Sequence, residues 1–140
     1  MSKQRIIGTT IEAIKAEELL VGKEFPVDFT KWLLDNNGLG IEHVYIYPVK
    51  DSRDMRKTWE SISYNFENGW SDWIGNFDDE TCFNHLLPFA DFGTGNYYCF
   101  DYNNGARVVI WKHESGEIEF RAGSFTEFKE KIKHGDFEYD

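Results

Sequence analysis

Cysteine, proline and long apolar runs are all scarce in this chain of 140 residues, which has two cysteines and three prolines. Cys82 and Cys99 lack the close Cys–Cys spacing and the His pair of a zinc site, so we expect reduced thiols, as in cytosolic proteins. No stretch reaches the length of a membrane span, and the N-terminus lacks the apolar segment of a signal peptide. We therefore expect a cytoplasmic location.

Basic residues are also few, because 15 Lys and Arg stand against 25 Asp and Glu, and the formal net charge is −10. Nucleic acids and anionic membrane surfaces are bound through basic patches, so neither is an expected partner. A basic protein is a better match, since opposite charges speed the encounter of two proteins.

Apolar and aromatic residues, by contrast, are plentiful, at 41% and 17% of the chain, which argues against disorder. A chain of this length buries about 68–70% of its unfolded surface and needs no disulfide or structural metal. We expect a single domain over residues 1–140, with a core at about 9–134 and a frayed acidic tail at 135–140.

The first third of the chain predicts two helices. Thr9 and Glu12 have the spacing of a capping box, which predicts a helix that ends near Gly22. Pro26 is typical of a first helical turn, and a second helix then runs to the Asn-Asn-Gly at 36–38.

The middle of the chain predicts one strand and one helix. The β-branched and aromatic run 41–49 indicates a strand, which Pro48 confines to a sheet edge or ends. A helix is expected from Asp51, with apolar residues at intervals of four, three and four. These residues are Met55, Trp59, Ile62 and Phe66. Residues 68–81 are expected to form an irregular connection.

The rest of the chain predicts a β meander and a last helix. A β region begins within 82–89, and strands are expected at 96–102, 106–113 and 116–122. Ile118 and Phe120 alternate with charged residues, as in an antiparallel sheet with one buried face. Ser124 and Glu127 form a second capping box for a helix at 124–133. The order of elements predicts an α+β domain, with an antiparallel sheet of about four to six strands packed with helices.

Two blocks of the sequence carry a family pattern. In the first block, EELLVGKEFPVDFTKWLLDNNG, Glu18 is followed in order by Val-Gly, Phe-Pro, Asp-Phe, Trp-Leu and a final Asn-Gly. The second block contains LLPFADFGTGNYYCFDY, RVVIWKHE and AGSFTEFKEKI. In this order they resemble the SUKH superfamily, which includes a fungal cell-wall assembly regulator and many bacterial immunity proteins. The resemblance covers about residues 9–134, and residues 39–85 depart from the pattern.

The resemblance implies a SUKH-like sheet and a domain that works by binding proteins. Bacterial members are similar in role to immunity proteins that neutralise toxins, often nucleases or deaminases. The partner it implies is a cognate toxin, which the charge of this chain suggests is basic. The fungal relative implies an alternative, a scaffold or regulatory interaction module. The family pattern carries over no catalytic set, so we expect neither an enzyme nor a cofactor. The sequence leaves the oligomeric state open.

Several residues invite a chemical interpretation that their context does not favour. Gly93-Thr94-Gly95 lacks the Lys of a P-loop and leads into a strand, so we expect a turn with positive φ rather than a phosphate site. Asp91 and Asp101 are expected to bond local backbone amides rather than to bind a metal. The four histidines lack metal-ligand spacing, and the serines lack a nucleophile-elbow context.

The segment with two tryptophans and four acids, 70–80, is the candidate partner-binding surface. Tryptophan is a frequent interface anchor, and the acids would steer a basic partner. The candidate residues are Trp70, Asp72, Trp73, Asp78, Asp79, Glu80 and Asp91. The alternative is that both tryptophans pack over the sheet as a satellite cluster. Trp32, Trp59 and Trp111 are expected to be structural.

Overall fold

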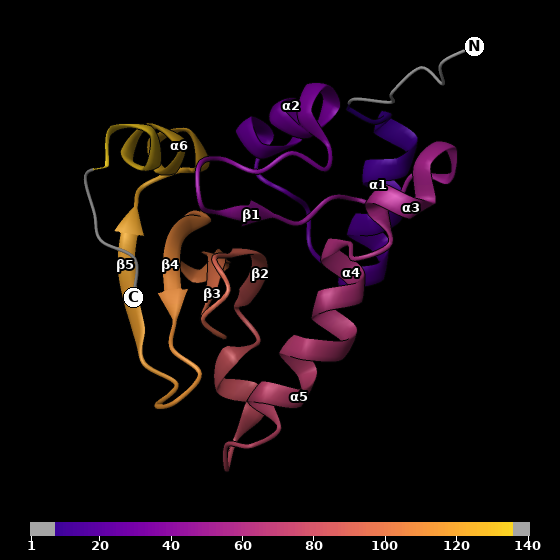
Figure 1. The fold of residues 1–140 in the computed structure, drawn as a ribbon. Helices are drawn as coiled ribbons and strands as arrows, with labels where there is room; N and C mark the ends of the chain where they lie inside the picture. The colour runs from indigo at the N-terminus through magenta and orange to yellow at the C-terminus, as the bar shows by residue number, and fades with distance from the viewer. Residues whose placement is uncertain (1–7, 136–140) are drawn as a thin grey trace.

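The computed structural model describes residues 8–135, so the predicted acidic tail beyond Gly135 and the N-terminal segment lie outside the described residues. Figure 1 shows one antiparallel sheet with helices on two sides. The α-helices are α1 (Ile11–Val21), α2 (Val27–Asn36), α3 (Met55–Thr58), α4 (Ile62–Asn65), α5 (Ser71–Ile74) and α6 (Phe125–His134). The strands are β1 (Tyr45–Ile46), β2 (Leu86–Asp91), β3 (Tyr97–Asp101), β4 (Arg107–Trp111) and β5 (Ile118–Ala122). Short turns of other helix types are η1 (Ser52–Asp54), η2 (Phe66–Trp70), η3 (Glu80–Phe83) and η4 (Tyr102–Asn104).

The sheet is a meander in which each strand pairs with the next one, in the order β1-β2-β3-β4-β5. Every pair is antiparallel. The α+β class, the strand number and the last helix are therefore as predicted. The predicted strand 41–49 is much shorter than expected, because Glu42 has a positive φ and Ile41 pairs with the nearby Val44 in a local turn. β1 is an edge strand, in agreement with the Pro48 that follows it.

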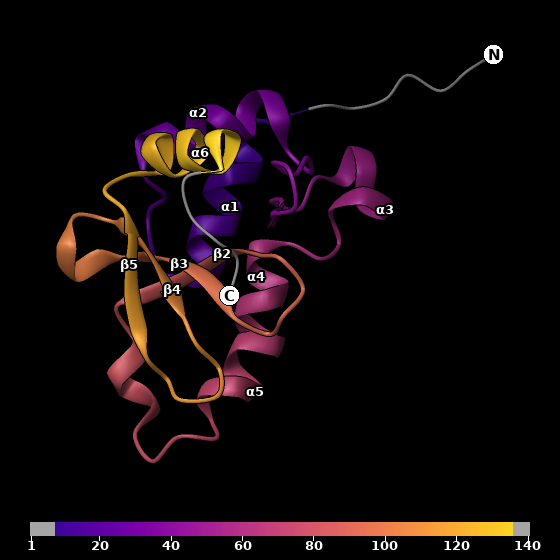
Figure 2. The ribbon, with the colours of Figure 1, turned by 60° about the vertical axis from the view of Figure 1, so that its left-hand side comes forward.

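One face of the sheet is covered by α2 and α6, which lie side by side in both ribbon views (Figures 1 and 2). Phe29 of α2 is fully buried and meets rings from two strands and from α6. Its ring centroid lies 5.6 Å from Phe89, 5.1 Å from Phe100 and 4.9 Å from Phe125. Edge-to-face ring contacts of this kind add to the energy of burial. This aromatic cluster joins both helices to the sheet.

The first sequence block places its polar residues at the ends of these helices. The Phe25 amide donates to Glu18 Oε2 at 2.7 Å and closes the loop between α1 and α2. Gly22 ends α1 in the left-handed conformation, as predicted. Asp28 Oδ2 accepts hydrogen bonds from the amide and hydroxyl of Thr126, both at 2.9 Å, and so ties α2 to the start of α6. The block is therefore a set of joints between elements of the core.

The capping boxes are confirmed at one helix and displaced at the other. Ser124 accepts from the Glu127 amide, as predicted. At α1 the N-cap is Thr10, which accepts from Ala13, so the predicted cap is wrong by one residue. Thr9 instead donates its hydroxyl hydrogen to Asp51 at 2.8 Å.

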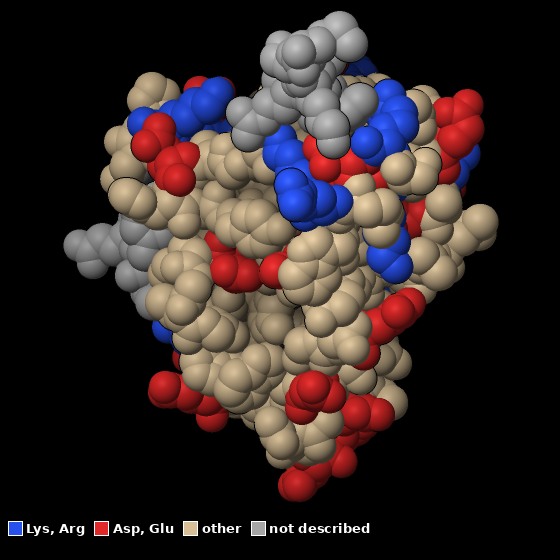
Figure 3. Space-filling view, turned by 45° about the vertical axis from the view of Figure 1, so that its right-hand side comes forward, with Lys and Arg blue, Asp and Glu red and all other residues tan. Residues whose placement is uncertain are grey.

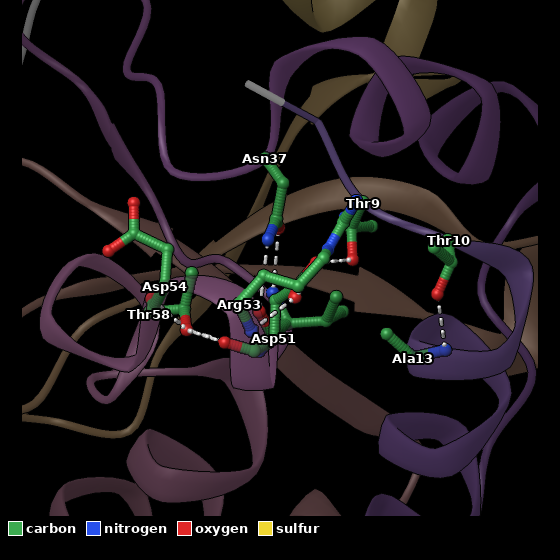
Figure 4. A network of polar contacts seen from close by, with 9 residues as sticks. Thr9, Thr10, Ala13, Asn37, Asp51, Arg53, Asp54 and Thr58 are labelled. Atoms are coloured by element: carbon green, nitrogen blue, oxygen red, sulfur yellow. Dashed lines mark hydrogen bonds and ion pairs between the residues drawn. The ribbon is translucent and has the colours of Figure 1, made fainter. Parts of the chain in front are cut away.

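A buried polar network around Asp51 joins the start of the chain to its middle (Figure 4). Asp51 accepts two hydrogen bonds from the Arg53 guanidinium and one from Thr9, and its own amide donates to Thr58. Close by, the Asn37 side chain exchanges two hydrogen bonds with the backbone of Val49. The network fixes the chain after β1 against the N-terminal helices.

The predicted helix after Asp51 is broken, which is a correction. Asp54 caps α3 and Ser61 caps α4, so two short helices replace one. A cap at each start turns the chain, and the residues between them leave the core. Met55 and Trp59 are consequently 45% and 48% exposed, and Trp59 is not the core residue that was predicted.

We expect Asp51 to make stability depend on acid pH. The hydrogen bonds from Arg53 hold the pKa of the Asp51 carboxyl well below its usual range, although burial opposes this. Its contribution is complete above the unfolded pKa of about 3.9 and is lost as the pH falls toward the lower folded pKa. The free energy of unfolding of wild type should therefore exceed that of Asp51→Asn at pH 7, and the difference should shrink at pH 3. A difference that stays constant down to pH 2 would contradict this.

Gly95 should be intolerant of a side chain for two reasons. Its φ is +93°, and a Cβ would lie 3.0 Å from the His113 ring. Gly93 has a φ of +91° but open space around it, so it is a matched control. We expect Gly93→Ala to cost about 1 kcal/mol in urea unfolding and Gly95→Ala to cost more. No loss in either variant would show that the turn does not need glycine.

Candidate protein-binding face

The sequence-predicted surface lies on the side of the molecule that holds α4 and α5. Figure 3 shows this side, with acidic side chains gathered over its lower end, where α5 and the loop after it lie. The same view shows a hollow near the middle of the face, with acidic atoms along its upper edge. Within the candidate segment, Asp72, Asp78, Asp79 and Glu80 are all exposed.

The segment predicted to be an irregular connection is largely helical. α4, η2 and α5 follow one another without a gap from Ile62 to Ile74, and η2 is a π-helix. One hydroxyl and one carboxylate fix the start of this run. The Ser61 hydroxyl accepts from the Tyr64 amide, and the Glu17 carboxylate of α1 accepts from the Ser63 amide at 2.6 Å. The run therefore has a defined position against α1.

The π-helix explains where Trp70 lies. In a regular α-helix, residues eight apart point about 80° away from each other. The wider π turn reduces this rotation, so that Ile62 and Trp70 are both buried. Trp70 is 2% exposed and contacts Trp111 and Tyr97, with ring centroids 4.9 and 5.5 Å away. The assignment of Trp70 to the binding surface is therefore wrong, because its side chain fills the second face of the sheet.

Trp73 lies at the border between core and surface. Its ring is half-buried against His113, with centroids 4.6 Å apart. His113 Nδ1 lies 2.7 Å from Asn96 Oδ1, at the end of the glycine-rich turn. Trp73 thus contacts His113, just after β4, which is itself held by the loop between β2 and β3, and the Trp73 side chain is only partly buried.

Two of the predicted acids have structural roles in addition to their charge. Asp79 caps η3 by accepting from the Thr81 amide and hydroxyl, and these bonds lower the pKa of its carboxyl. Asp91 accepts from the Gly93 amide at 2.9 Å, as expected of a turn residue. Asp72, Asp78 and Glu80 are the other acids of the segment, and all three are exposed.

Asp91 also belongs to a group of tyrosines, which the sequence analysis missed. Its Oδ2 accepts the hydroxyl hydrogen of Tyr47 at 2.6 Å, and Tyr45 is its partner in the β1–β2 register. Burial is the largest cause that raises the pKa of Tyr97 to about 12, and the charges of Asp91 and Asp72 add to it. Gly69 of η2 lies against the Tyr97 hydroxyl, and Asp72 follows Gly69 by about one helical turn, so Asp91 and Asp72 approach the same phenol from β2 and from the helical run.

Trp59 and Tyr64 are further surface aromatics that sequence reasoning placed elsewhere. They form an edge-to-face pair with centroids 5.2 Å apart, and Tyr64 is 39% exposed. The two capping residues on either side, Asp54 and Ser61, are the signal that Trp59 lies outside a continuous helix. The face therefore presents tryptophan and tyrosine, the residue types most enriched in interface hot spots.

The described residues give no support to a metal or nucleophile site. Within 8–135, no group of three His, Cys, Asp or Glu residues is placed to hold a metal ion. Asp101 bonds the Asn103 amide and Arg107, and the β2–β3 register puts it about 16 Å from Asp91 along the strands. Ser61 and Ser124 are helix caps. Burial raises the pKa of the Cys99 thiol well above its usual value.

The molecule is thus an α+β domain with one antiparallel meander between two helical layers. Residues 8–131 match the model of the SMI1 / KNR4 family (SUKH-1), and the chain belongs to this family. The match confirms the resemblance to the SUKH superfamily that the two sequence blocks carry. No curated protein matches the chain. Over residues 8–135, no helix combines the length and apolar character needed to cross a membrane.

A buried and an exposed tryptophan, Trp70 and Trp59, should differ in their contribution to stability. Trp70→Ala removes a buried ring from the second face of the sheet and should lower the free energy of unfolding by about 3–5 kcal/mol. Trp59→Ala, the matched exposed control, should change it by less than about 0.5 kcal/mol. Guanidinium titration followed by circular dichroism measures both. Equal losses would mean that Trp59 is part of the core.

Proposed function

We propose that the chain is a non-enzymatic, cytoplasmic immunity protein that neutralises a cognate bacterial toxin by binding it directly. Membership of the SUKH-1 family supports a protein-binding role. The observation that carries the proposal is the stretch from α3 to the loop after α5, which exposes the rings of Trp59 and Tyr64, part of Trp73 and several carboxylates. We call this the aromatic–acidic face: Trp59, Tyr64, Asp72, Trp73, Asp78 and Glu80.

The charge of the chain supports a basic toxin, such as a nuclease that binds nucleic acid. The net charge is −10, and the acids at the lower end of the face would attract a positively charged surface. Blocking such a toxin requires only that the face cover its substrate-binding surface. This mode of inhibition needs no catalytic residue in the immunity protein.

A second candidate function is a scaffold or regulatory interaction module, which the same family membership supports. The two functions differ in what the partner does. The tagged full-length chain would be purified from its native host and the bound protein identified. The partner gene would then be expressed alone and together with this chain. Growth arrest by the partner, relieved by co-expression, supports immunity. A partner that is harmless alone would overturn it in favour of the scaffold.

The surface aromatics should carry binding energy without contributing much to folding. Trp59→Ala should weaken binding of the identified partner by about 2 kcal/mol, as for a buried interface anchor. Trp73→Ala should weaken it as well, with a small loss of stability because its ring also contacts His113. Leu19→Ala, at an 85% exposed position on α1, is the control and should leave the affinity unchanged. Titration calorimetry measures all three, and a larger effect of Leu19→Ala would move the interface to α1.

Association and dissociation rates separate the contribution of charge at the same interface from that of the aromatic contacts. Reversal of Asp78 and Glu80 to Lys should slow association and weaken its dependence on salt, with little change in dissociation. Asp79 is left in place because it caps η3. Association rates that do not change, with the partner and a folded variant, would show that these acids do not face the partner.

A further inference from the structure

Three tyrosines surround Asp91 where the edge of the sheet meets the helical run. We call this group the tyrosine–acid site: Tyr45, Tyr47, Asp91 and Tyr97, with Asp72 of α5 beside it. Tyr47 is buried and holds Asp91 by a 2.6 Å hydrogen bond, and the Gly93 amide holds the other carboxylate oxygen at 2.9 Å. The position of the carboxylate is therefore fixed from two directions before any ligand arrives.

The rim of the site is aromatic and still accessible. Tyr45 is 36% exposed, and its ring packs edge-to-face on Tyr47 with centroids 5.5 Å apart. Glu60 lies close enough, with Asp91, to raise the pKa of the Tyr45 phenol, although burial is the largest cause. In the sheet register Tyr45 lies opposite Asp91, so its ring stands at the open edge of the site.

The Tyr97 hydroxyl is a group of the site that makes no hydrogen bond within the described part of the fold. Tyr97 is 93% buried, being 7% exposed, yet its hydroxyl makes no hydrogen bond to any residue in 8–135. It lies against Gly69 in the π-helix, where a Cβ would be only 2.7 Å from the hydroxyl oxygen. Glycine at this position therefore makes room for the hydroxyl. The hydroxyl oxygen is not among the enclosed unpaired atoms of residues 8–135, so it reaches solvent and can pair with a ligand that enters the site.

The chemistry of the site fits a planar cation. Two carboxylates repel anions, and the unpaired hydroxyl and charges disfavour an apolar group. Aromatic rings attract cations through their faces, and carboxylates form their strongest hydrogen bonds with charged donors. The acceptors come from different elements, so a ligand needs several donors that point in different directions. A guanidinium has five donors in a flat fork, whereas an ammonium is a compact point charge.

We propose that the tyrosine–acid site binds the guanidinium of an arginine side chain that the partner protein presents. Asp91 and Asp72 accept its N–H groups, the Tyr97 hydroxyl oxygen accepts another, and the exposed Tyr45 ring covers one side of the plane. The origin of the arginine in a partner protein rests on the proposed function. The affinity of the site for a guanidinium does not, because it is a property of this chain alone.

The probe is N-acetyl-arginine methylamide, with the citrulline compound as an uncharged control of the same shape. Both would be titrated into the full-length protein and followed by the amide resonances of Gly69, Asp72 and Gly93. The arginine probe should shift these resonances with a millimolar Kd that weakens as salt is added. Equal shifts with citrulline would overturn the proposal, because the site would then not recognise charge.

Variants test which atoms are responsible. Asp91→Asn can still accept the Gly93 amide hydrogen but has no charge, and Tyr97→Phe removes only the hydroxyl. Each should weaken the arginine probe about tenfold, as for the loss of a hydrogen bond to a charged group. The matched controls Asp78→Asn and Tyr64→Phe change the same chemical groups elsewhere on the face and should leave Kd within about twofold. Equal effects of site and control variants would overturn the assignment.

A lysine probe and the partner itself complete the test. N-acetyl-lysine methylamide should bind at least about fivefold more weakly, since an ammonium meets fewer of the acceptors at once. Equal affinity would overturn the assignment to guanidinium. Failure of the proposed function is a separate result. If the partner is harmless when expressed alone but the arginine titration is as expected, the immunity function is overturned and the tyrosine–acid site stands. If the partner is a toxin that the chain neutralises, but Asp91→Asn and Tyr97→Phe do not change its affinity, the proposed arginine contact is overturned and the immunity function stands.

Discussion

The packing of Phe29 between α2, α6 and the middle of the sheet is the contact on which the rest of the fold depends. Its ring is fully buried and touches rings from β2, β3 and α6, so one side chain joins elements that are up to about 100 residues apart in the sequence. Asp28, its neighbour, fixes the same helices by hydrogen bonds to Thr126. With these joints in place, the meander presents its other face to the middle third of the chain.

The sheet therefore has two faces with different origins. The face toward α2 and α6 is filled by residues of the two sequence blocks that carry the family pattern. The other face is filled by Trp70, Phe77 and Phe83, which come from the segment that departs from it, together with Trp111 of β4. The middle segment can therefore vary in sequence while the first face holds the fold.

The same division separates what could be predicted from the sequence. The meander and the last helix follow from strong local signals, such as the strand pattern of Ile118–Ala122 and the Ser124 cap, and the structure contains both. The buried face predicted for that strand is wrong at Phe120, which is 52% exposed on the edge strand and lies beneath Arg107 and Lys131 rather than in the core. The helical segment after Asp51 was predicted wrongly because apolar spacing cannot distinguish one helix from two capped ones. Burial of Trp70 and the gathering of tyrosines around Asp91 depend on contacts between distant elements, and periodicity gives no sign of them. Trp70 was therefore wrongly assigned to the candidate surface, and the tyrosine–acid site was not predicted.

The π-helix also bears on how the length of the chain can vary. Ile62 and Trp70 are eight residues apart, and side chains seven apart in a regular α-helix would point within about 20° of each other. A chain one residue shorter between them would hold the same two side chains in the core without a π turn. Only the outward bulge beside Tyr97 would change. An insertion or deletion of a single codon is thus enough to change the outer surface of this helical run in evolution while the buried contacts of the domain are retained.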